Sequence, residues 1–139
     1  MTSILPELKT LLAYKNEAVV QRYTKEFPHA SLSAEVAFEE LMKFMWLSLK
    51  AQADRKNFTC AMHEEMFDID NMWHCFVLFT RDYQYFCETY LGKFFHHNPL
   101  TEDEKELSDE EYENELTEYL NYIHDNLGEN TLKTWFQHE

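Results

Sequence analysis

Apolar residues recur along most of this chain with the three- and four-residue spacing of an α-helix. In the clearest run, from Val36 to Leu49, apolar side chains cover most of the helical circumference, which predicts a helix at the centre of a bundle. For residues 57–69 we predict a loop that contains a short helix around Met62–Phe67. The remaining stripes predict helices from Leu8 to Leu12, Asn16 to Phe27, Asn71 to Phe79, Thr80 to Gly92, Ser108 to Leu127 and Thr131 to Gln137.

Polar residues that favour an N-cap stand at the starts of the predicted helices, where they can accept hydrogen bonds from free backbone N–H groups. They are Asn16, Ser33, Thr80, Thr101 and Ser108. Gly92 and Gly128 stand at helix ends, where a left-handed residue is common. These signals divide the chain into short helices joined by short connections.

The segment Asn71–Phe79 allows a second interpretation. Its CFVLF run is short and rich in strand-forming residues, as in a buried β-strand. We favour a helix because Thr80 and the stripe that includes Tyr83 and Phe86 continue it as a helix–turn–helix. The chain as a whole is therefore expected to be a compact all-α bundle of six or seven helices in a single domain, 1–139.

Composition supports that fold and excludes several classes of function. The chain has 139 residues, of which 45% are hydrophobic, so it can form its own core. It contains only two glycines and three prolines, which is too few for many hairpin turns. The same scarcity of glycine excludes a P-loop and the Gly-rich fingerprint of dinucleotide-binding proteins.

We expect a soluble, cytoplasmic protein with no membrane association. No hydrophobic run approaches the roughly 18 residues of a spanning helix, and the first residues do not resemble a signal peptide. Three cysteines without CxxC spacing favour reduced thiols over a disulfide framework. Cys60 and Cys75 have no basic neighbour that would lower the thiol pKa, so neither is expected to act as a nucleophile.

Negative charge is concentrated in the acidic helical segment 101–127. The whole chain has a net charge of −14, and residues 101–125 account for −10 of it, with eleven acidic residues against one basic residue. This balance argues against binding to a nucleic-acid backbone. The segment is either a solvated helix face or an interaction surface for a basic protein partner. The candidate residues are Glu102, Asp103, Glu104, Glu106, Glu110 and Glu111.

A possible metal site lies in the stretch from Asp70 to Pro99, which we name the central motif. Asp70 and His74 share a helix face, and a reversal of the chain at Thr80 would bring further ligands to them. The candidate ligands are Asp70, His74, Cys87, His96 and His97, a set that suits zinc or iron. In the other interpretation Cys87 and His74 are core residues, and no cofactor is bound. Because His74 stands in an apolar run, we expect its ring to be buried and to need a partner.

The pattern of the central motif resembles the glycine-rich domain-containing protein-like family. The resemblance covers about 30 residues and rests on Asp70-x-x-Trp73-His74, then Thr80, Tyr83, Phe86, Cys87, Gly92 and His97-x-Pro99. It supports Asp70, Trp73, His74, Cys87 and His97 as the site residues. We expect structural roles in the motif for Trp73, Thr80, Tyr83, Phe86, Gly92 and Pro99. The resemblance implies no reaction, and the glycine-rich tail of that family is absent.

Two functions follow from these patterns. The first is a small acidic protein-interaction or regulatory module in which the central motif is largely structural. The alternative is a transition-metal-binding protein, including a metal-dependent enzyme, that uses the His, Cys and Asp residues of segment 70–97. The sequence indicates no particular reaction for either.

Overall fold

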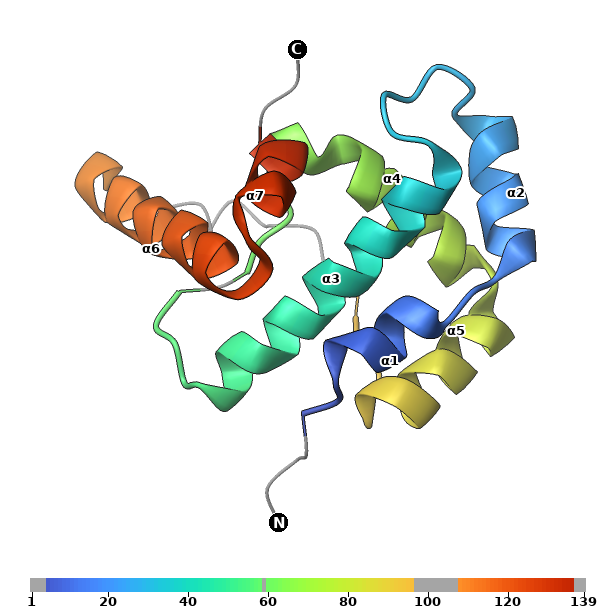
Figure 1. Cartoon of the computed structure of the whole chain (residues 1–139), viewed down its shortest axis with the longest axis horizontal. Helices are drawn as coiled ribbons and strands as arrows, with labels where there is room; N and C mark the ends of the chain where they lie inside the picture. Colours follow the sequence, from blue (N-terminus) through green and yellow to red (C-terminus); the bar gives the residue numbers. More distant parts are fainter. Residues whose placement is uncertain (1–4, 59, 97–107, 137–139) are drawn as a thin grey trace.

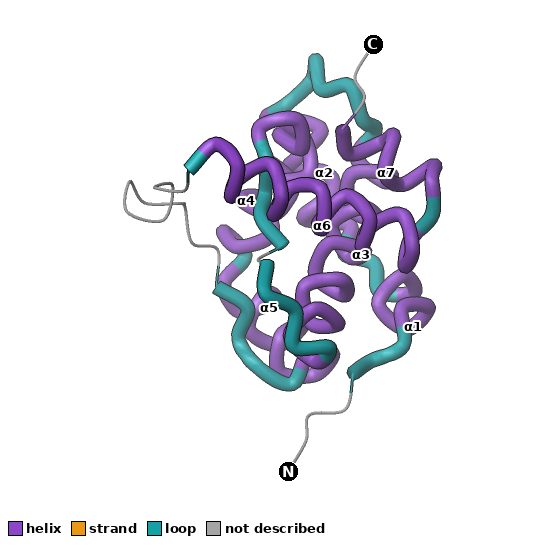
Figure 2. The backbone as a smooth tube through the Cα atoms, turned by 90° about the vertical axis from the view of Figure 1, so that its left-hand side faces the viewer, coloured by secondary structure: helices purple, strands orange, loops and turns teal. Residues whose placement is uncertain are grey.

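Helices form the whole of the described chain in this computed structural model, apart from the connections between them. The structure describes residues 5–58, 60–96 and 108–136, and this part contains no strand (Figures 1 and 2). The α-helices are α1 (Leu8–Ala13), α2 (Glu17–Glu26), α3 (Ala34–Ala53), α4 (Phe67–Leu78), α5 (Thr80–Phe86), α6 (Asp109–Leu127) and α7 (Glu129–Phe136). The predicted all-α fold is confirmed.

Helix α3 is the centre of the bundle. It crosses the molecule between α1, α2 and α4 on one side and α6 and α7 on the other (Figure 1). Twelve of its twenty residues are buried, and Leu41, Met42 and Met45 are completely inaccessible. Each fully buried side chain of this size stabilises the fold by about 1.5–3 kcal/mol. The predicted central position of the 36–49 run is therefore confirmed.

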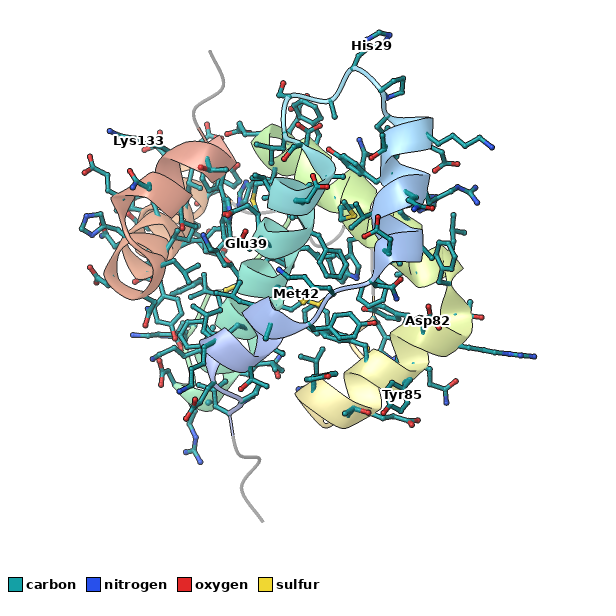
Figure 3. The ribbon with its side chains drawn as sticks, turned by 45° about the vertical axis from the view of Figure 1, so that its right-hand side comes forward. His29, Glu39, Met42, Asp82, Tyr85 and Lys133 are labelled. Atoms are coloured by element: carbon teal, nitrogen blue, oxygen red, sulfur yellow. The ribbon has the colours of Figure 1, made fainter. Side chains whose placement is uncertain are left out.

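Side-chain orientation follows the same division between core and surface. In Figure 3, Met42 lies in the interior, whereas His29, Tyr85 and Lys133 lie at the periphery. Tyr85 is 65% exposed and is the most accessible large apolar side chain among the described residues. None of the described helices is both long enough and apolar enough to cross a membrane.

Three of the predicted N-caps are present. The side chains of Asn16 and Ser33 accept hydrogen bonds of 3.3 Å from the backbone N–H groups of Val19 and Val36. Ser108 accepts one of 3.1 Å from the N–H of Glu111. Each bond satisfies a donor that a helix start would otherwise leave free, which is typically worth about 1 kcal/mol. The predicted cap at Thr101 lies outside the described residues.

The break between α4 and α5 is present, but its details differ from the prediction. The segment Asn71–Phe79 is helical, and α4 begins four residues earlier, after a 3₁₀ turn at Glu64–Met66. Thr80 is not the N-cap of α5: Phe79 occupies that position without a side-chain cap, and Thr80 is the first helical residue. The non-helical backbone angles fall at Phe79, one residue before Thr80, so the hydroxyl of Thr80 is not at the position from which an N-cap accepts.

Residues with positive φ end three helical segments. Gly92 has φ +78° and is left-handed after the π-helical turn Cys87–Leu91, as predicted. Gly128 ends α6 as predicted, with φ +94° and ψ 169°. Arg55 has φ +56° after α3, and the N–H of Lys56 donates to the carbonyl of Ala51 across it at 3.0 Å. A non-glycine residue in this conformation is unfavourable, so the end of α3 contains local strain.

Candidate functional site

The central motif is organised around a relay of aromatic hydrogen bonds. The indole Nε1 of Trp73 on α4 donates to the hydroxyl of Tyr83 on α5 at 2.9 Å. The hydroxyl of Tyr83 in turn donates to the backbone carbonyl of Phe95, whose ring stacks on Trp73 at 5.2 Å. The relay satisfies the polar atoms of two buried aromatic residues and holds the segment after Gly92 against α4.

Phe86 completes the buried part of the motif, with its ring 5.3 Å from that of Phe76 on α4. Gly92 needs its left-handed backbone, and an added Cβ would meet no atom within 4 Å, so conformation rather than space selects glycine here. Pro99 lies outside the described residues.

His74 lies on the outside of α4 rather than in the core. Its neighbours Trp73, Cys75 and Phe76 are buried, while His74 is exposed. The expectation of a buried ring was wrong because one residue of a helix that packs on one side must face water. Its charged neighbour is Glu26 of α2, whose pKa is lowered first by its hydrogen bond from Arg22 and, more weakly, by His74.

The metal ligands proposed from sequence do not converge in the described part of the chain. His74 faces solvent, whereas Cys87 faces the core beside Tyr83. His96 is exposed, with its ring 4.7 Å from that of Phe94. Among the described residues, no three His, Cys, Asp or Glu side chains, Asp70 included, gather into a group that could hold a metal ion.

His97 lies outside the described residues, so zinc or iron binding stays a prediction. The metal content of protein purified without an affinity tag tests it. Loss of the metal in Cys87→Ser and His97→Gln would identify the ligands.

The thiols do not have the properties of nucleophiles. Burial raises the pKa of Cys60 to about 12 and that of Cys75 to about 11. Cys75 is hydrogen-bonded to Glu26 at 3.6 Å, which also raises its pKa. Burial likewise raises the pKa of Cys87, although hydrogen bonds with the backbone of Phe95 and the side chain of Tyr83 oppose the shift. At neutral pH all three remain protonated.

Sequence reasoning missed a buried polar network between α3 and α7. Glu40 is 5% exposed and accepts hydrogen bonds from Trp135 Nε1 at 2.8 Å and from Lys43 Nζ at 2.9 Å. Lys43 also donates to Thr131 at 3.2 Å. A signal was available: Glu40 and Lys43 are charged residues three apart within the mostly apolar run from Val36 to Leu49. The network fixes α7 against the centre of the bundle.

Asp68 is a second buried carboxylate that sequence reasoning did not select. It is 2% exposed and accepts a 3.0 Å hydrogen bond from the backbone N–H of Leu32, in the loop between α2 and α3. The hydroxyl of Tyr23 donates to the carbonyl of the same Leu32 at 3.3 Å. Both polar groups of one loop residue are thus satisfied, so Asp68 has a structural role.

The acidic segment is described from Ser108 onward. Glu110 and Glu111 of the predicted interaction surface are exposed on α6, whereas Glu102, Asp103, Glu104 and Glu106 lie outside the described residues. Asp109, Glu110 and Glu111 occupy the first turn of α6, where the helix dipole favours negative charge. Helix stability alone therefore explains part of the acidic composition, and the whole first two turns remain accessible.

Comparison with known proteins gives a family assignment and corrects the resemblance drawn from the motif. A family model described as UCP032817-like matches residues 9–129, so the resemblance to the glycine-rich domain-containing protein-like family was wrong. The motif gave a wrong family because Trp73, Tyr83 and Phe86 are buried core residues. Their spacing follows from the packing of helices and does not identify a family. No curated protein and no solved structure matches the chain.

Proposed function

The chain belongs to the UCP032817-like family, and we propose that it is a small acidic protein-interaction module that binds a basic partner through the start of α6. The observation that supports this proposal is the accessibility of the first two turns of α6: every residue from Asp109 to Asn114 is exposed. We name Asp109, Glu110, Glu111 and Glu113 the acidic surface.

Helix α6 is attached to the bundle through its second half. Tyr119, Tyr122 and Ile123 are buried, and the hydroxyl of Tyr119 donates to the carbonyl of Ala61 at 3.0 Å. The hydroxyl of Tyr122 donates to Asp54 at 2.5 Å. Because these contacts fix the helix from residue 119 onward, the acidic surface is not needed to hold α6 in place.

The carboxylates of the acidic surface keep their charge available. Within the described ranges, no lysine or arginine forms an ion pair with Glu110, Glu111 or Glu113. Tyr112 lies among them and is 48% exposed, so it offers an apolar contact beside the charges. A basic protein segment that carries an apolar residue matches both features.

Affinity capture with charge-matched variants tests the proposal. The variant Glu110→Gln/Glu111→Gln/Glu113→Gln removes three charges from α6. The control Glu35→Gln/Glu39→Gln/Glu88→Gln removes three exposed charges elsewhere. The wild type and the control should retain the same basic protein from a cell extract, and the α6 variant should lose it. Retention of that protein by the α6 variant would contradict the proposal.

A further inference from the structure

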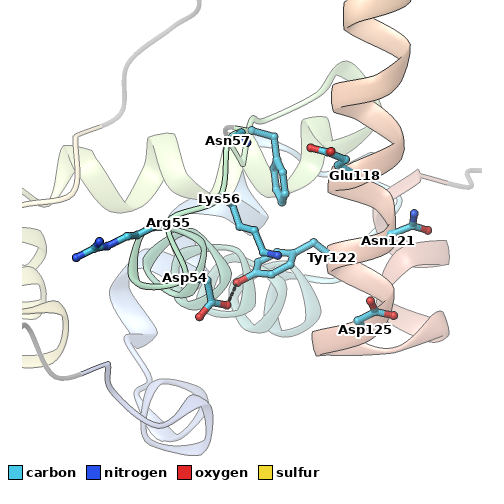
Figure 4. A pocket seen from close by; sticks show the side chains of 9 residues that line it. Asp54, Arg55, Lys56, Asn57, Glu118, Asn121, Tyr122 and Asp125 are labelled. Carbon is cyan, nitrogen blue, oxygen red and sulfur yellow. Dashed lines mark hydrogen bonds between the residues drawn. The ribbon is translucent and has the colours of Figure 1, made fainter.

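A pocket of about 410 Å³ lies between the turn that ends α3 and the second half of α6 (Figure 4). Residues 54–58 form one wall, and Glu118, Asn121, Tyr122 and Asp125 form the other. The pocket is open to solvent, since only Phe58 and Tyr122 among its lining residues are buried. The pocket lies on the far part of α6 from the acidic surface and is independent of the function proposed for that surface.

The α3 wall is basic. Arg55 and Lys56 are the one place in the sequence where two basic residues are adjacent. In the part of the chain that the structure describes, neither forms an ion pair with a carboxylate. Lys56 Nζ lies 5.3 Å from the centroid of the Tyr122 ring, and this cation–π contact positions its charge at the pocket (Figure 4).

The α6 wall is acidic. Glu118, Asn121, Tyr122 and Asp125 follow the i, i+3, i+4, i+7 spacing that places them on one side of the helix (Figure 4). Glu118 and Asp125 are both exposed. The amide groups of Asn121 and, across the pocket, Asn57 add donors and acceptors to both walls.

The remaining charged residue of the pocket is already neutralised by the protein. Asp54 accepts hydrogen bonds from Lys50 Nζ at 2.7 Å and from the Tyr122 hydroxyl at 2.5 Å. Both donors meet the same oxygen, so Asp54 joins the two walls at the base of the pocket. In Figure 4 the Arg55 side chain extends away from the α6 wall, so Lys56 is the basic group of the α3 wall that faces the pocket. Glu118 and Asp125 are the carboxylates of the other wall, and Asp125 Oδ1 also lies 3.5 Å from His124 Nδ1.

We propose that this pocket binds a small zwitterion of the α-amino acid or dipeptide class. Its carboxylate faces Lys56, and its ammonium group faces Glu118 and Asp125. A simple anion would be repelled by the α6 wall, and a simple cation by the α3 wall. A molecule that carries both charges is favoured by both walls, which gives the pocket its selectivity.

Titration followed by ¹H–¹⁵N NMR tests the proposal with four related probes. Alanine and alanyl-alanine carry both charges, N-acetylalanine carries the carboxylate alone, and alaninamide carries the ammonium alone. At least one zwitterion should shift the amide signals of Asn57 and Asn121 saturably, with a dissociation constant of about 1 mM or tighter. Whichever of alanine and alanyl-alanine binds more tightly shows whether the pocket prefers an amino acid or a dipeptide. The singly charged probes should bind about tenfold more weakly.

Substitutions on opposite walls complete the test. Lys56→Gln and Glu118→Gln should each weaken binding of the zwitterion roughly tenfold, while Lys25→Gln, an exposed change on α2, should leave it unchanged. Unchanged thermal unfolding of the variants shows that the fold is intact. Equal binding of N-acetylalanine or alaninamide, no saturable shift with either zwitterion, or equal binding by the pocket variants would each overturn the proposal.

Discussion

His63 lies half-buried in a ring of aromatic side chains, where the loop before α4 meets the last two helices. Its ring centroid is 5.5 Å from that of Tyr119, 5.6 Å from that of Phe136 and 6.4 Å from that of Tyr112. Burial lowers the pKa of His63 below its ordinary value of 6.5, although the charges of Glu65 and Glu115 oppose this shift. The folded state therefore favours the neutral ring.

This pKa shift predicts how stability depends on pH. The unfolded chain binds a proton at His63 below about pH 6.5, whereas the folded chain resists it until a lower pH, so acidification favours unfolding. The neutral His63 ring thus makes its full contribution to the free energy of unfolding above pH 6.5, and this contribution is lost as the pH falls. Urea unfolding is measured at about pH 7.5 and pH 5.5 for the wild type and for His63→Phe. Between these two pH values the free energy of unfolding should fall more in the wild type than in the variant. Parallel losses would refute the assignment.

Substitutions at Arg55 and Gly92, which both have positive φ, should change the free energy of unfolding in opposite directions. Arg55→Gly should raise the free energy of unfolding by about 0.5–1 kcal/mol, because glycine adopts φ +56° without the Cβ penalty. Gly92→Ala should lower it by about 1 kcal/mol, since the added Cβ meets no atom and only the backbone conformation is penalised. Both are measured by urea unfolding. Loss of stability in Arg55→Gly would show that its strain is compensated locally.

Among the elements, α7 depends most clearly on buried polar contacts. Trp135→Phe would leave one oxygen of Glu40 without its donor in a dry site, so we expect a loss of about 2 kcal/mol in the free energy of unfolding. Trp46→Phe is the matched control. Its indole donates to the carbonyl of Pro6, which is only part-buried, so this change should cost about 1 kcal/mol or less. Equal losses would mean that Glu40 is rehydrated.

Sequence predicted the helices best where a local signal exists. Asn16, Ser33 and Ser108 were identified as caps because the capping bond joins residues three apart. The start of α4 has no such signal, since Met66 precedes it without a side-chain cap and a 3₁₀ turn leads into it. The prediction for Thr80 failed for a related reason: a good capping residue stands one position inside the helix.

The candidate site could be predicted less well than the helices because it depends on contacts between distant residues. The Glu40–Trp135 bond joins residues 95 positions apart, and the pocket unites the end of α3 with α6. Periodicity also placed His74 in the core, since its neighbours are apolar, although the helix turns this one position outward. Spacing along the chain establishes which residues share a face of one helix, and it does not establish which faces meet.

At the scale of the whole molecule, charge and stability are separated. Helix α6 is fixed through Tyr119, Tyr122 and Ile123, while the acidic surface extends along its exposed start. Neutralising Glu110, Glu111 and Glu113 should change the melting temperature little, because the lower self-repulsion of a chain with a net charge of −14 offsets the lost interactions of Glu110 and Glu111 with the helix dipole. Thermal unfolding followed by circular dichroism checks this. A marked drop would assign the carboxylates a structural role.

The salt dependence of association tests the interaction proposal most directly. The rate constant for association with the captured basic protein is measured at several salt concentrations for the wild type, the α6 variant Glu110→Gln/Glu111→Gln/Glu113→Gln and the control Glu35→Gln/Glu39→Gln/Glu88→Gln. We predict that the wild type and the control associate rapidly at low salt and slow steeply as salt is added, and that the α6 variant is about tenfold slower at low salt with a shallower dependence. Identical rates and slopes for all three proteins would contradict a role for the acidic surface.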